Sequence, residues 1–333
     1  MRVGVNYPWL DYGWDFGLGP PRWRGDRTAP RWLDVIDKHL DRLRAIGITV
    51  VRWFILADGL TYGTDAAAPR RDEAVPGGWR FDPPALDQDV VDAFDELLRR
   101  FARTASAGAA PMQLIPVLVD FHFCGPALRP VEDDDGWVKR GRADAIRDAE
   151  KRSRFLTAAL DPLLAVSARY PDVIYAWELI NEPDWVTDGW HPNPFARPPI
   201  PERAMRDFLD DGVTRIHAAG FASTIGYASI DTLRRSNVQA SIDQFHYYPD
   251  GRSLLASHSL DAPVSRIIGE FATSTDDIWP DLAVTSQDVG HRLALAARRG
   301  YALALPWSFL AVDRHTSWSE RVEWDIRTFT QGV

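Results

Sequence analysis

The stretch AWELINEP, residues 176–183, decides the fold, because a short apolar run ends there in a carboxylate, Glu182. A second run of the same kind, RIIGEF at 266–271, carries Glu270. The two glutamates are separated by close to three strand–helix units of roughly 30 residues each, the repeat of an eight-unit barrel of about 250 residues. We therefore expect both carboxylates at the C-terminal ends of parallel strands, where such a barrel holds its functional residues.

The rest of the chain alternates short apolar runs with segments of helical periodicity. Trp32, Ile36, Leu40 and Leu43 follow helical spacing, and Gly47 can end that helix before the next apolar run begins. Glycine marks the same junction at Gly108, Gly220 and Gly300. The last helix is expected near 319–331. The pattern predicts strands at 2–7, 48–55, 112–121, 173–181, 222–227, 241–247, 264–270 and 302–308.

Alternating strands and helices predict a parallel sheet covered by helices. An open doubly wound sheet is the rival arrangement, but no Gly-x-Gly-x-x-Gly motif follows an early strand. Eight units with carboxylates at strand ends favour a closed (β/α)8 TIM barrel, an α/β fold. The chain has 333 residues, of which 45% are hydrophobic and 26% charged, and we expect one catalytic domain over residues 1–333.

Charge and cysteine content argue against several classes of partner. The formal charge of −9 argues against nucleic acid and against an anionic membrane surface. Cys124 is the only cysteine, which rules out an intrachain disulfide and a metal site built from cysteines. No apolar run approaches the ~18 residues of a membrane span, and no signal peptide precedes the first predicted strand. We therefore expect a cytoplasmic protein, although a trimmed chain would look the same, and the oligomeric state stays open.

Long loops follow the first four predicted strands, and all would leave the barrel at its C-terminal face. These loops are 8–30, 57–85, 122–141 and 183–200. The long loops and the later ones are rich in tryptophan, whose apolar indole face can stack on a sugar ring. The residues are Trp9, Trp14, Trp23, Trp79, Trp137, Trp185, Trp190, Trp279 and Trp318. Either they contact a carbohydrate or they pin the loops to the barrel.

The loop from Asp184 to Pro201 leaves the barrel directly after Glu182. The loop carries Trp185 and Trp190, and we expect it to wall the site beside that glutamate. Glu182 itself precedes Pro183, which has no N–H and helps to end the strand.

A pair of carboxylates facing one cavity is typical of glycoside hydrolysis, in which one acid donates a proton and the other attacks or activates water. Asn181, beside Glu182, offers an amide that could hydrogen-bond a sugar hydroxyl. The residues alone thus indicate a carbohydrate as the molecule that binds.

The pattern resembles glycoside hydrolase clan A and, within it, glycoside hydrolase family 5, the cellulase and mannanase family. The resemblance rests first on Glu182 in Asn-Glu-Pro and Glu270 in Gly-Glu-Phe. It spans residues 2 to 310 and implies a retaining β-glycosidase without cofactor or metal, with Glu182 as acid and base and Glu270 as nucleophile. Six supporting positions match in order, namely Arg52, His122, Asn181, His246, Tyr248 and Trp307.

Each supporting residue also has a physical role to test. Arg52 could hold Glu270 ionised or could pair with Glu178 deeper in the barrel, and Tyr248 could donate to Glu270. Glu182 must stay protonated, which requires partial burial and the negative field of Glu270. Trp307 would form the floor under the sugar.

The two histidines, His122 and His246, would bind hydroxyls or orient the carboxylates, and Trp185 would contact the substrate. Either histidine could instead be a core residue with its hydrogen bonds satisfied.

Other functions remain open on the same residues. A transglycosylase would transfer the sugar to a hydroxyl instead of water, and a catalytically silent barrel would bind sugar only. A metal-dependent isomerase or lyase would use the glutamates as ligands. Asp120 with His122 suggests metal, but no third ligand stands at a suitable spacing. For the retaining reaction, the carboxyl groups of Glu182 and Glu270 are expected about 5–5.5 Å apart.

Overall fold

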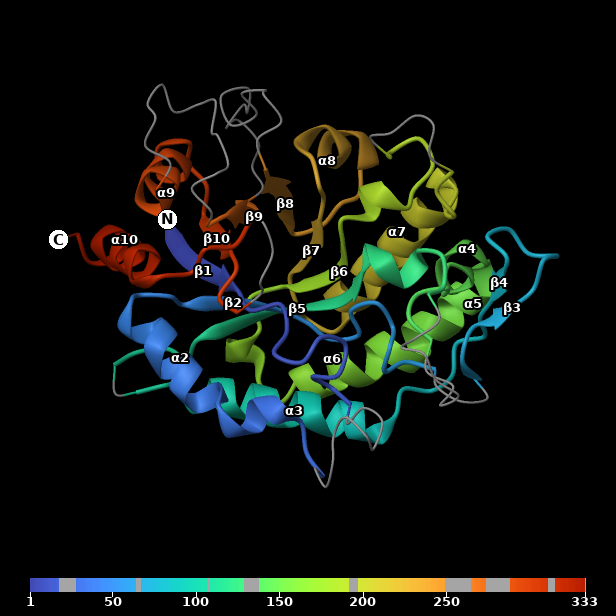
Figure 1. Cartoon of the computed structure of the whole chain (residues 1–333), viewed down its shortest axis with the longest axis horizontal. Helices are drawn as coiled ribbons and strands as arrows, with labels where there is room; N and C mark the ends of the chain where they lie inside the picture. The colour runs from blue at the N-terminus through green and yellow to red at the C-terminus, as the bar shows by residue number, and fades with distance from the viewer. Residues whose placement is uncertain are drawn as a thin grey trace.

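Eight parallel strands close into a barrel in the order β1-β10-β9-β8-β7-β6-β5-β2 (Figure 1). This computed structural model describes residues 1–17, 28–63, 67–106, 108–128, 138–191, 197–248, 265–273, 288–310 and 315–332. The closed parallel barrel confirms the predicted (β/α)8 TIM fold. Its strands are β1 (Arg2–Asn6), β2 (Val50–Phe54), β5 (Gln113–Asp120), β6 (Trp177–Asn181), β7 (Ser223–Gly226), β8 (Ile242–Tyr247), β9 (Ser265–Ala272) and β10 (Leu303–Trp307).

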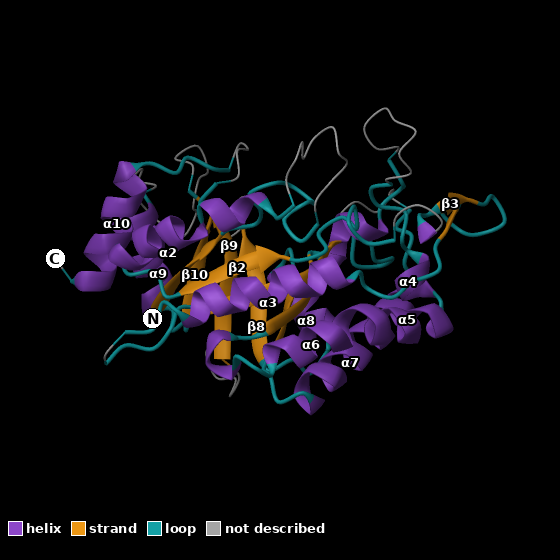
Figure 2. Cartoon of the chain, turned by 90° about the horizontal axis from the view of Figure 1, so that it is seen from below, coloured by secondary structure: helices purple, strands orange, loops and turns teal. Residues whose placement is uncertain are grey.

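Helices enclose the barrel, and loops gather at one of its ends (Figure 2). No helix in the described part of the chain is long and apolar enough to cross a membrane. Side chains cap several helix starts, as where Ser319 accepts from the N–H of Val322. The helices are α2 (Ile36–Ala45), α3 (Gln88–Ala102), α4 (Asp144–Arg147), α5 (Ala149–Phe155), α6 (Asp161–Ser167), α7 (Glu202–Ala218), α8 (Ile230–Ser236), α9 (Val289–Arg298) and α10 (Glu320–Gln331).

The interior of the barrel changes from apolar to polar along the strands. One cluster of buried apolar side chains includes Val50, Ile115 and Ile242. Successive side chains of a strand point to opposite faces, so the residue two positions further on faces the same side. At two of these positions the sequence has Arg52 and Gln244, and both are fully buried. An apolar layer thus supports a polar one that lies nearer the C-terminal face.

The observed elements follow the predicted ones closely. Gly47, Gly108, Gly220 and Gly300 all have positive φ, between 78° and 88°, as expected after a helix. The fourth strand begins later than predicted, at Trp177, because a 3-10 turn, η5 (Pro171–Val173), takes up the start of the predicted range. The second long loop also contains an unpredicted hairpin, β3 (Arg70–Arg71) with β4 (Trp79–Arg80).

Arg142 pins the second and third long loops together from a fully buried position. Its guanidinium donates to backbone carbonyls on both sides, those of Tyr62, Val138 and Arg140 at 2.7–2.8 Å and that of Gly63 at 3.4 Å. The group also lies 5.1 Å from the ring centroid of Phe81. One side chain therefore satisfies the backbone of two loops that border the C-terminal face.

Arg142→Met should destabilise the protein, because it leaves buried carbonyls without donors. Each such loss costs about 1–3 kcal/mol, so we expect the free energy of unfolding to fall by at least about 3 kcal/mol. Urea denaturation followed by circular dichroism measures the change. Arg71→Met is the matched control, since Arg71 is 76% exposed and its loss should change stability by less than about 0.5 kcal/mol. Equal effects of the two variants would contradict this role for Arg142.

Candidate active site

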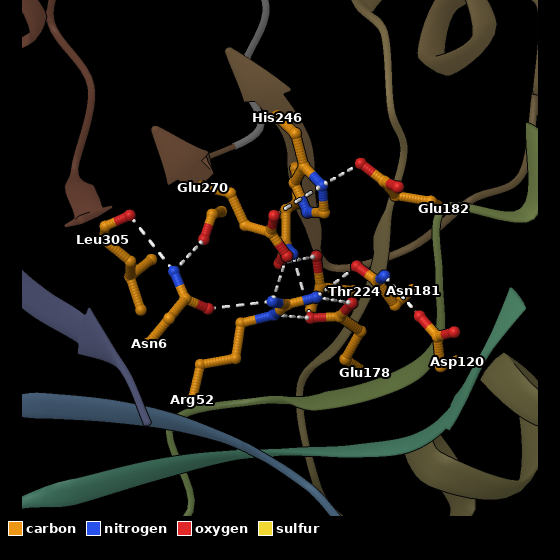
Figure 3. A network of polar contacts seen from close by, with 12 residues as sticks. Asn6, Arg52, Asp120, Glu178, Asn181, Glu182, Thr224, His246, Glu270 and Leu305 are labelled. Carbon is orange, nitrogen blue, oxygen red and sulfur yellow. Dashed lines mark hydrogen bonds and ion pairs between the residues drawn. The ribbon is translucent and has the colours of Figure 1, made fainter. Parts of the chain in front are cut away.

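Arg52 stands at the centre of a hydrogen-bond network inside the barrel (Figure 3). Its Nε and one Nη2 proton bind the two oxygens of Glu178, each at 2.7 Å. Nη1 donates to Glu270 Oε1 at 2.6 Å and to Asn6 Oδ1 at 2.8 Å, and Nη2 also donates to Asn181 Oδ1 at 2.7 Å. All five N–H groups thus have acceptors. Arg52 therefore makes both contacts considered from the sequence, with Glu178 and with Glu270.

Gln244 and two glycines complete the layer around Glu178. Gln244 Nε2 donates to Glu178 Oε2 at 2.9 Å, and its Oε1 accepts from Thr224 Oγ1 at 3.1 Å. A Cβ at Gly226 would collide with the Glu178 carboxylate, and one at Gly269 would collide with the Gln244 amide. The glycine before Glu270 is thus explained by the space that a buried amide needs.

Glu270 lies on β9 with its side chain only 6% exposed. Oε1 accepts from Arg52, and Oε2 accepts from the hydroxyl of Tyr248 at 3.0 Å, the contact expected from the sequence. Burial raises the pKa of Glu270, whereas His246 and Arg52 act in the opposite direction. The carboxylate form therefore has a cation and a hydroxyl donor directed at it.

Glu182 follows β6 in the left-handed region, with φ 47° and ψ 53°. Non-glycine residues are uncommon in this region, and such strained residues cluster at functional sites. Its side chain is 16% exposed. Trp185 Nε1 donates to Oε2 at 2.8 Å, and His246 Nδ1 lies 2.9 Å from Oε1. The carboxyl group of Glu182 is thus held at the wall of the site, less deeply buried than that of Glu270.

Burial raises the pKa of Glu182 to about 7, and the negative charge of Asp120 adds to the effect. The repulsion between Glu182 and Glu270 expected from the sequence is present and raises the pKa of Glu270, and Asp120 is a further anion beside Glu182 that the sequence does not indicate. The Trp185 N–H and the Arg52 cation lower the pKa of Glu182 in turn. A large fraction of Glu182 is therefore protonated near neutral pH.

His246 lies between the two glutamates. Its Nδ1 is 2.9 Å from Glu182 Oε1 and 3.6 Å from Glu270 Oε2. Burial lowers the pKa of His246, which favours the neutral ring. Nε2 has no hydrogen-bond partner among the described residues, and an unpaired N–H costs more than an unpaired lone pair in a buried site. The proton is therefore assigned to Nδ1, where it points at the carboxyl groups.

Asp120 connects two of the predicted site residues. Its Oδ1 accepts from the backbone N–H of His122 at 2.9 Å and also contacts the ring Nδ1. Its Oδ2 accepts from Asn181 Nδ2 at 2.7 Å. These bonds orient the imidazole of His122 and the amide of Asn181. Asn181 Oδ1 in turn accepts from Arg52, which connects Asp120 to the network around Arg52. The sequence suggests Asp120 only as a metal ligand and does not predict this orienting role, although the Asp-Phe-His spacing is a usable signal.

A cavity of about 460 Å³ opens over this network. Arg52 and His246 lie beneath it, both almost completely buried. Trp307 is 9% exposed at its wall and meets Trp9 edge to face at 6.0 Å. The structure thus brings all the predicted site residues together, and those that line the cavity are His122, Asn181, Glu182, Trp185, Tyr248, Glu270 and Trp307.

The tryptophans of the loops divide between the two expected roles. Trp9 and Trp185 line the cavity, whereas Trp14 is buried. The loop after Glu182 walls the site as expected through Trp185, whereas Trp190 packs at 3% exposure against Tyr227, with Arg206 over its ring. Trp318 packs on Phe309. Trp23, Trp137 and Trp279 lie outside the described residues.

The two carboxyl groups face each other at short range. One oxygen of Glu182, one oxygen of Glu270 and a ring nitrogen of His246 all lie within 4.8 Å of one another. An approach of two carboxylate oxygens to within 4.8 Å places both carboxyl groups in one small space, as the position of the glutamates at the strand ends predicts.

The same three residues are the one cluster in the described part of the chain that could hold a metal ion. The cluster joins His246 to the two glutamates and includes neither Asp120 nor His122, the pair that suggested metal from the sequence. However, Arg52 and Tyr248 already occupy both oxygens of Glu270, and a buried guanidinium next to the site disfavours a second cation.

Comparison with solved structures finds the same barrel in several enzymes. The β-1,4-D-mannanase from Cryptopygus antarcticus aligns with a TM-score of 0.65 at 17% identity, over 98% of this chain and 89% of that one. The β-mannanase from the blue mussel Mytilus edulis aligns with a TM-score of 0.66 at 16% identity, over 98% and 91%. A glycoside hydrolase 5 lichenase from Caldicellulosiruptor sp. F32 gives 0.56 at 13% identity, over 99% and 93%.

The chain has the fold of glycoside hydrolase family 5. The resemblance expected from the sequence is thus confirmed at the level of the fold. No protein-family model matches the sequence, and no curated protein does. At these identities the function depends on the site itself.

Glu182→Gln should stabilise the protein at alkaline pH. A carboxyl group whose pKa is raised from 4.5 to about 7 on folding costs no stability below pH 4.5, where both states are protonated. The cost grows as pH rises and is complete above pH 7, at up to about 3 kcal/mol. Denaturation at pH 4.5 and pH 8 should therefore show a gain for Glu182→Gln at pH 8 only. The exposed Glu150→Gln is the control, and a gain of equal size at both pH values would contradict the raised pKa of Glu182.

Proposed function

We propose that this protein is a retaining β-glycoside hydrolase in which Glu182 is the general acid and base and Glu270 is the nucleophile. The observation that carries the proposal is a pair of carboxyl groups within 4.8 Å across one cavity, in different environments. Arg52 and Tyr248 donate to Glu270 and favour its carboxylate, whereas Glu182 accepts from the Trp185 N–H, and burial together with Asp120 raises its pKa to about 7. Environments that separate the protonation of two carboxyl groups are the usual basis for dividing acid and nucleophile.

In the first step, Glu270 attacks the anomeric carbon while Glu182 donates its proton to the departing glycosidic oxygen. Oε1 of Glu270 stays bound to Arg52 beneath the site, so Oε2 is the attacking atom. Trp307 lies at the cavity wall where the sugar ring would stack. The step forms a glycosyl-enzyme ester and releases the aglycone.

In the second step, Glu182 is ionised and acts as the base. It takes a proton from water, the hydroxide oxygen attacks the anomeric carbon, and the ester bond to Glu270 breaks. His246 Nδ1, 2.9 Å from Glu182 and 3.6 Å from Glu270, can hold both carboxyl groups in place through the cycle. Two displacements at one carbon leave its configuration unchanged.

The proposed substrate is a β-linked oligosaccharide or glycoside. Structural neighbours named as β-1,4-mannanases, together with the lichenase, make β-1,4-linked mannosides and glucosides the first compounds to test. Seven Trp, Tyr and Phe residues line the cavity and offer apolar faces to sugar rings, namely Trp9, Tyr12, Phe54, Phe121, Trp185, Tyr248 and Trp307. A screen of aryl β-glycosides and short oligosaccharides tests the proposal.

The same screen separates the alternatives. Transfer of the sugar to a second sugar, seen as longer products, would indicate a transglycosylase. Loss of activity on chelation, with metal in the purified protein, would indicate an enzyme that uses Glu182, His246 and Glu270 as ligands. A protein that binds the oligosaccharides without cleaving any would be a silent sugar-binding barrel.

Azide should distinguish the two glutamates. Glu182→Ala lacks the acid and the base, but an aryl glycoside with a good leaving group needs little acid assistance, so its glycosyl-enzyme should still form. Azide then attacks without a general base, restores turnover and yields a β-glycosyl azide. Glu270→Gln should lose activity on every substrate, by about 10⁴-fold or more. The β-glycosyl azide from Glu270→Ala, with the α-glycosyl azide from Glu182→Ala, would reverse the assignment, because azide that replaces the nucleophile inverts the anomeric carbon once.

Trp185→Phe should move the alkaline limb of the pH profile of kcat/KM to higher pH. Glu182 must be protonated, so activity should fall as pH rises through about 7. The Trp185 N–H lowers the pKa of Glu182, and phenylalanine cannot make this bond. Trp190→Phe is the matched control from the same loop, because Trp190 packs away from the cavity. A limb that moves equally in both variants, or in neither, would contradict the role of Trp185.

A further inference from the structure

A second cavity of about 310 Å³ lies beyond the catalytic one and plays no part in the proposed chemistry. Three loops line it. The β3–β4 hairpin supplies Trp79, the segment after β5 supplies Cys124 and Gly125, and the loop after Glu182 supplies Arg197. Figure 1 places the hairpin at the edge of the molecule, beside α4 and α5.

The two cavities share one wall. The 3-10 turn η3 (Phe121–Cys124) follows β5, and its first residues, Phe121 and His122, line the catalytic cavity. Its last residue, Cys124, lines the second cavity. Phe121 also lies 6.4 Å from Trp185, whose indole N–H binds Glu182. The second cavity therefore lies across η3 from the catalytic one, on the side of the proposed acid rather than of the nucleophile.

Trp79 offers an indole face in this second cavity. Its side chain is partly exposed, and it stacks on no other aromatic ring among the described residues. Prolines and glycines make up most of the remaining wall, so the lining is apolar and has few long side chains. Arg197 is exposed at the rim and adds a cationic hydrogen-bond donor. An apolar wall with a few polar groups is typical of a ligand site.

The hairpin that carries Trp79 is fixed to the helices beside it. Asp144 accepts from the N–H of Phe81 at 3.2 Å and pairs with Lys151 at 3.1 Å, and Lys151 also binds Asp82 at 3.0 Å. Arg147 donates to the carbonyl of Pro76. Because the loop is anchored at both ends of β4, the indole is held in place before any ligand arrives, which lowers the entropic cost of binding.

We propose that this second cavity is a distal subsite that binds the leaving-group end of a β-linked oligosaccharide or polysaccharide chain, with Trp79 stacking on a sugar ring and Arg197 binding its hydroxyls. The proposal rests on the proposed glycosidase function and refines it. A chain that occupies both cavities has several sugar units on the leaving-group side of the cleaved bond, so the enzyme favours oligosaccharides or polysaccharides over small glycosides.

The test measures kcat/KM against chain length. The substrates are an aryl β-mannoside, an aryl β-glucoside, and β-1,4-linked manno- and gluco-oligosaccharides of two to six units. Trp79→Ala should leave the aryl glycosides and disaccharides unchanged and should lower kcat/KM for the hexasaccharides roughly three- to tenfold, mainly through KM. Arg197→Ala should show the same dependence on length. Trp324→Ala is the matched control, since Trp324 is 53% exposed on α10, away from both cavities.

Binding to the Glu270→Gln variant gives a second readout that needs no turnover. Calorimetry with mannohexaose and cellohexaose should show a loss of affinity on adding Trp79→Ala, with no loss for the disaccharides. If Trp79→Ala and Arg197→Ala affect all lengths equally, or none, the distal subsite is wrong even though the enzyme cleaves glycosides. If the parent protein cleaves nothing, the proposed hydrolase is wrong, and the length dependence of binding alone then decides the subsite.

Discussion

The burial of Arg52 is the constraint on which the rest of the site depends. Burying a guanidinium is costly unless every N–H has an acceptor. The acceptors here come from β1, β6 and β9, through Asn6, Glu178, Asn181 and Glu270. These strands are far apart in the sequence, so one side chain sets their relative depth in the barrel. The bonds that stabilise Arg52 are the same bonds that orient Glu270, and the stability of the fold and the geometry of the site are therefore coupled.

Much of the site could be predicted because strands of a parallel barrel are apolar runs and its functional carboxylates follow them. Glu182 and Glu270 needed only this pattern. Asn6 and Gln244 could not be found in the same way, because a polar residue in a strand also fits a surface position. The register matters too: an irregularity between Phe245 and His246 places His246 opposite Glu270. Such bulges redirect side chains and have no reliable mark in a single sequence.

The loops were less predictable than the strands for a physical reason. Trp185 and Trp190 are five residues apart on one loop, yet the first lines the cavity and the second is buried. Their directions depend on a 3-10 turn at Pro183–Trp185 and on the bridge between Thr187 and Ile200. Loop conformation is set by such local contacts rather than by hydrophobic periodicity, so the sequence could place both tryptophans in the loop but not say which of them faces the site.

The difference in hydrogen-bond donors between the two glutamates accounts for their different roles in the proposed mechanism, since Arg52 and Tyr248 donate to Glu270 and Trp185 donates to Glu182. Glu270, at 6% exposure, shares Arg52 with Glu178, so two carboxylates face one cation. A negative charge on Glu182 would be repelled by these carboxylates and by Asp120 in a site of low dielectric. The protonated form of Glu182 is therefore favoured. Once Glu270 becomes an ester, it no longer carries a negative charge. The positive charge of Arg52 is then neutralised by Glu178 alone. Because Arg52 lowers the pKa of Glu182, its influence then grows, and the group that had to be an acid in the first step becomes a base for the second.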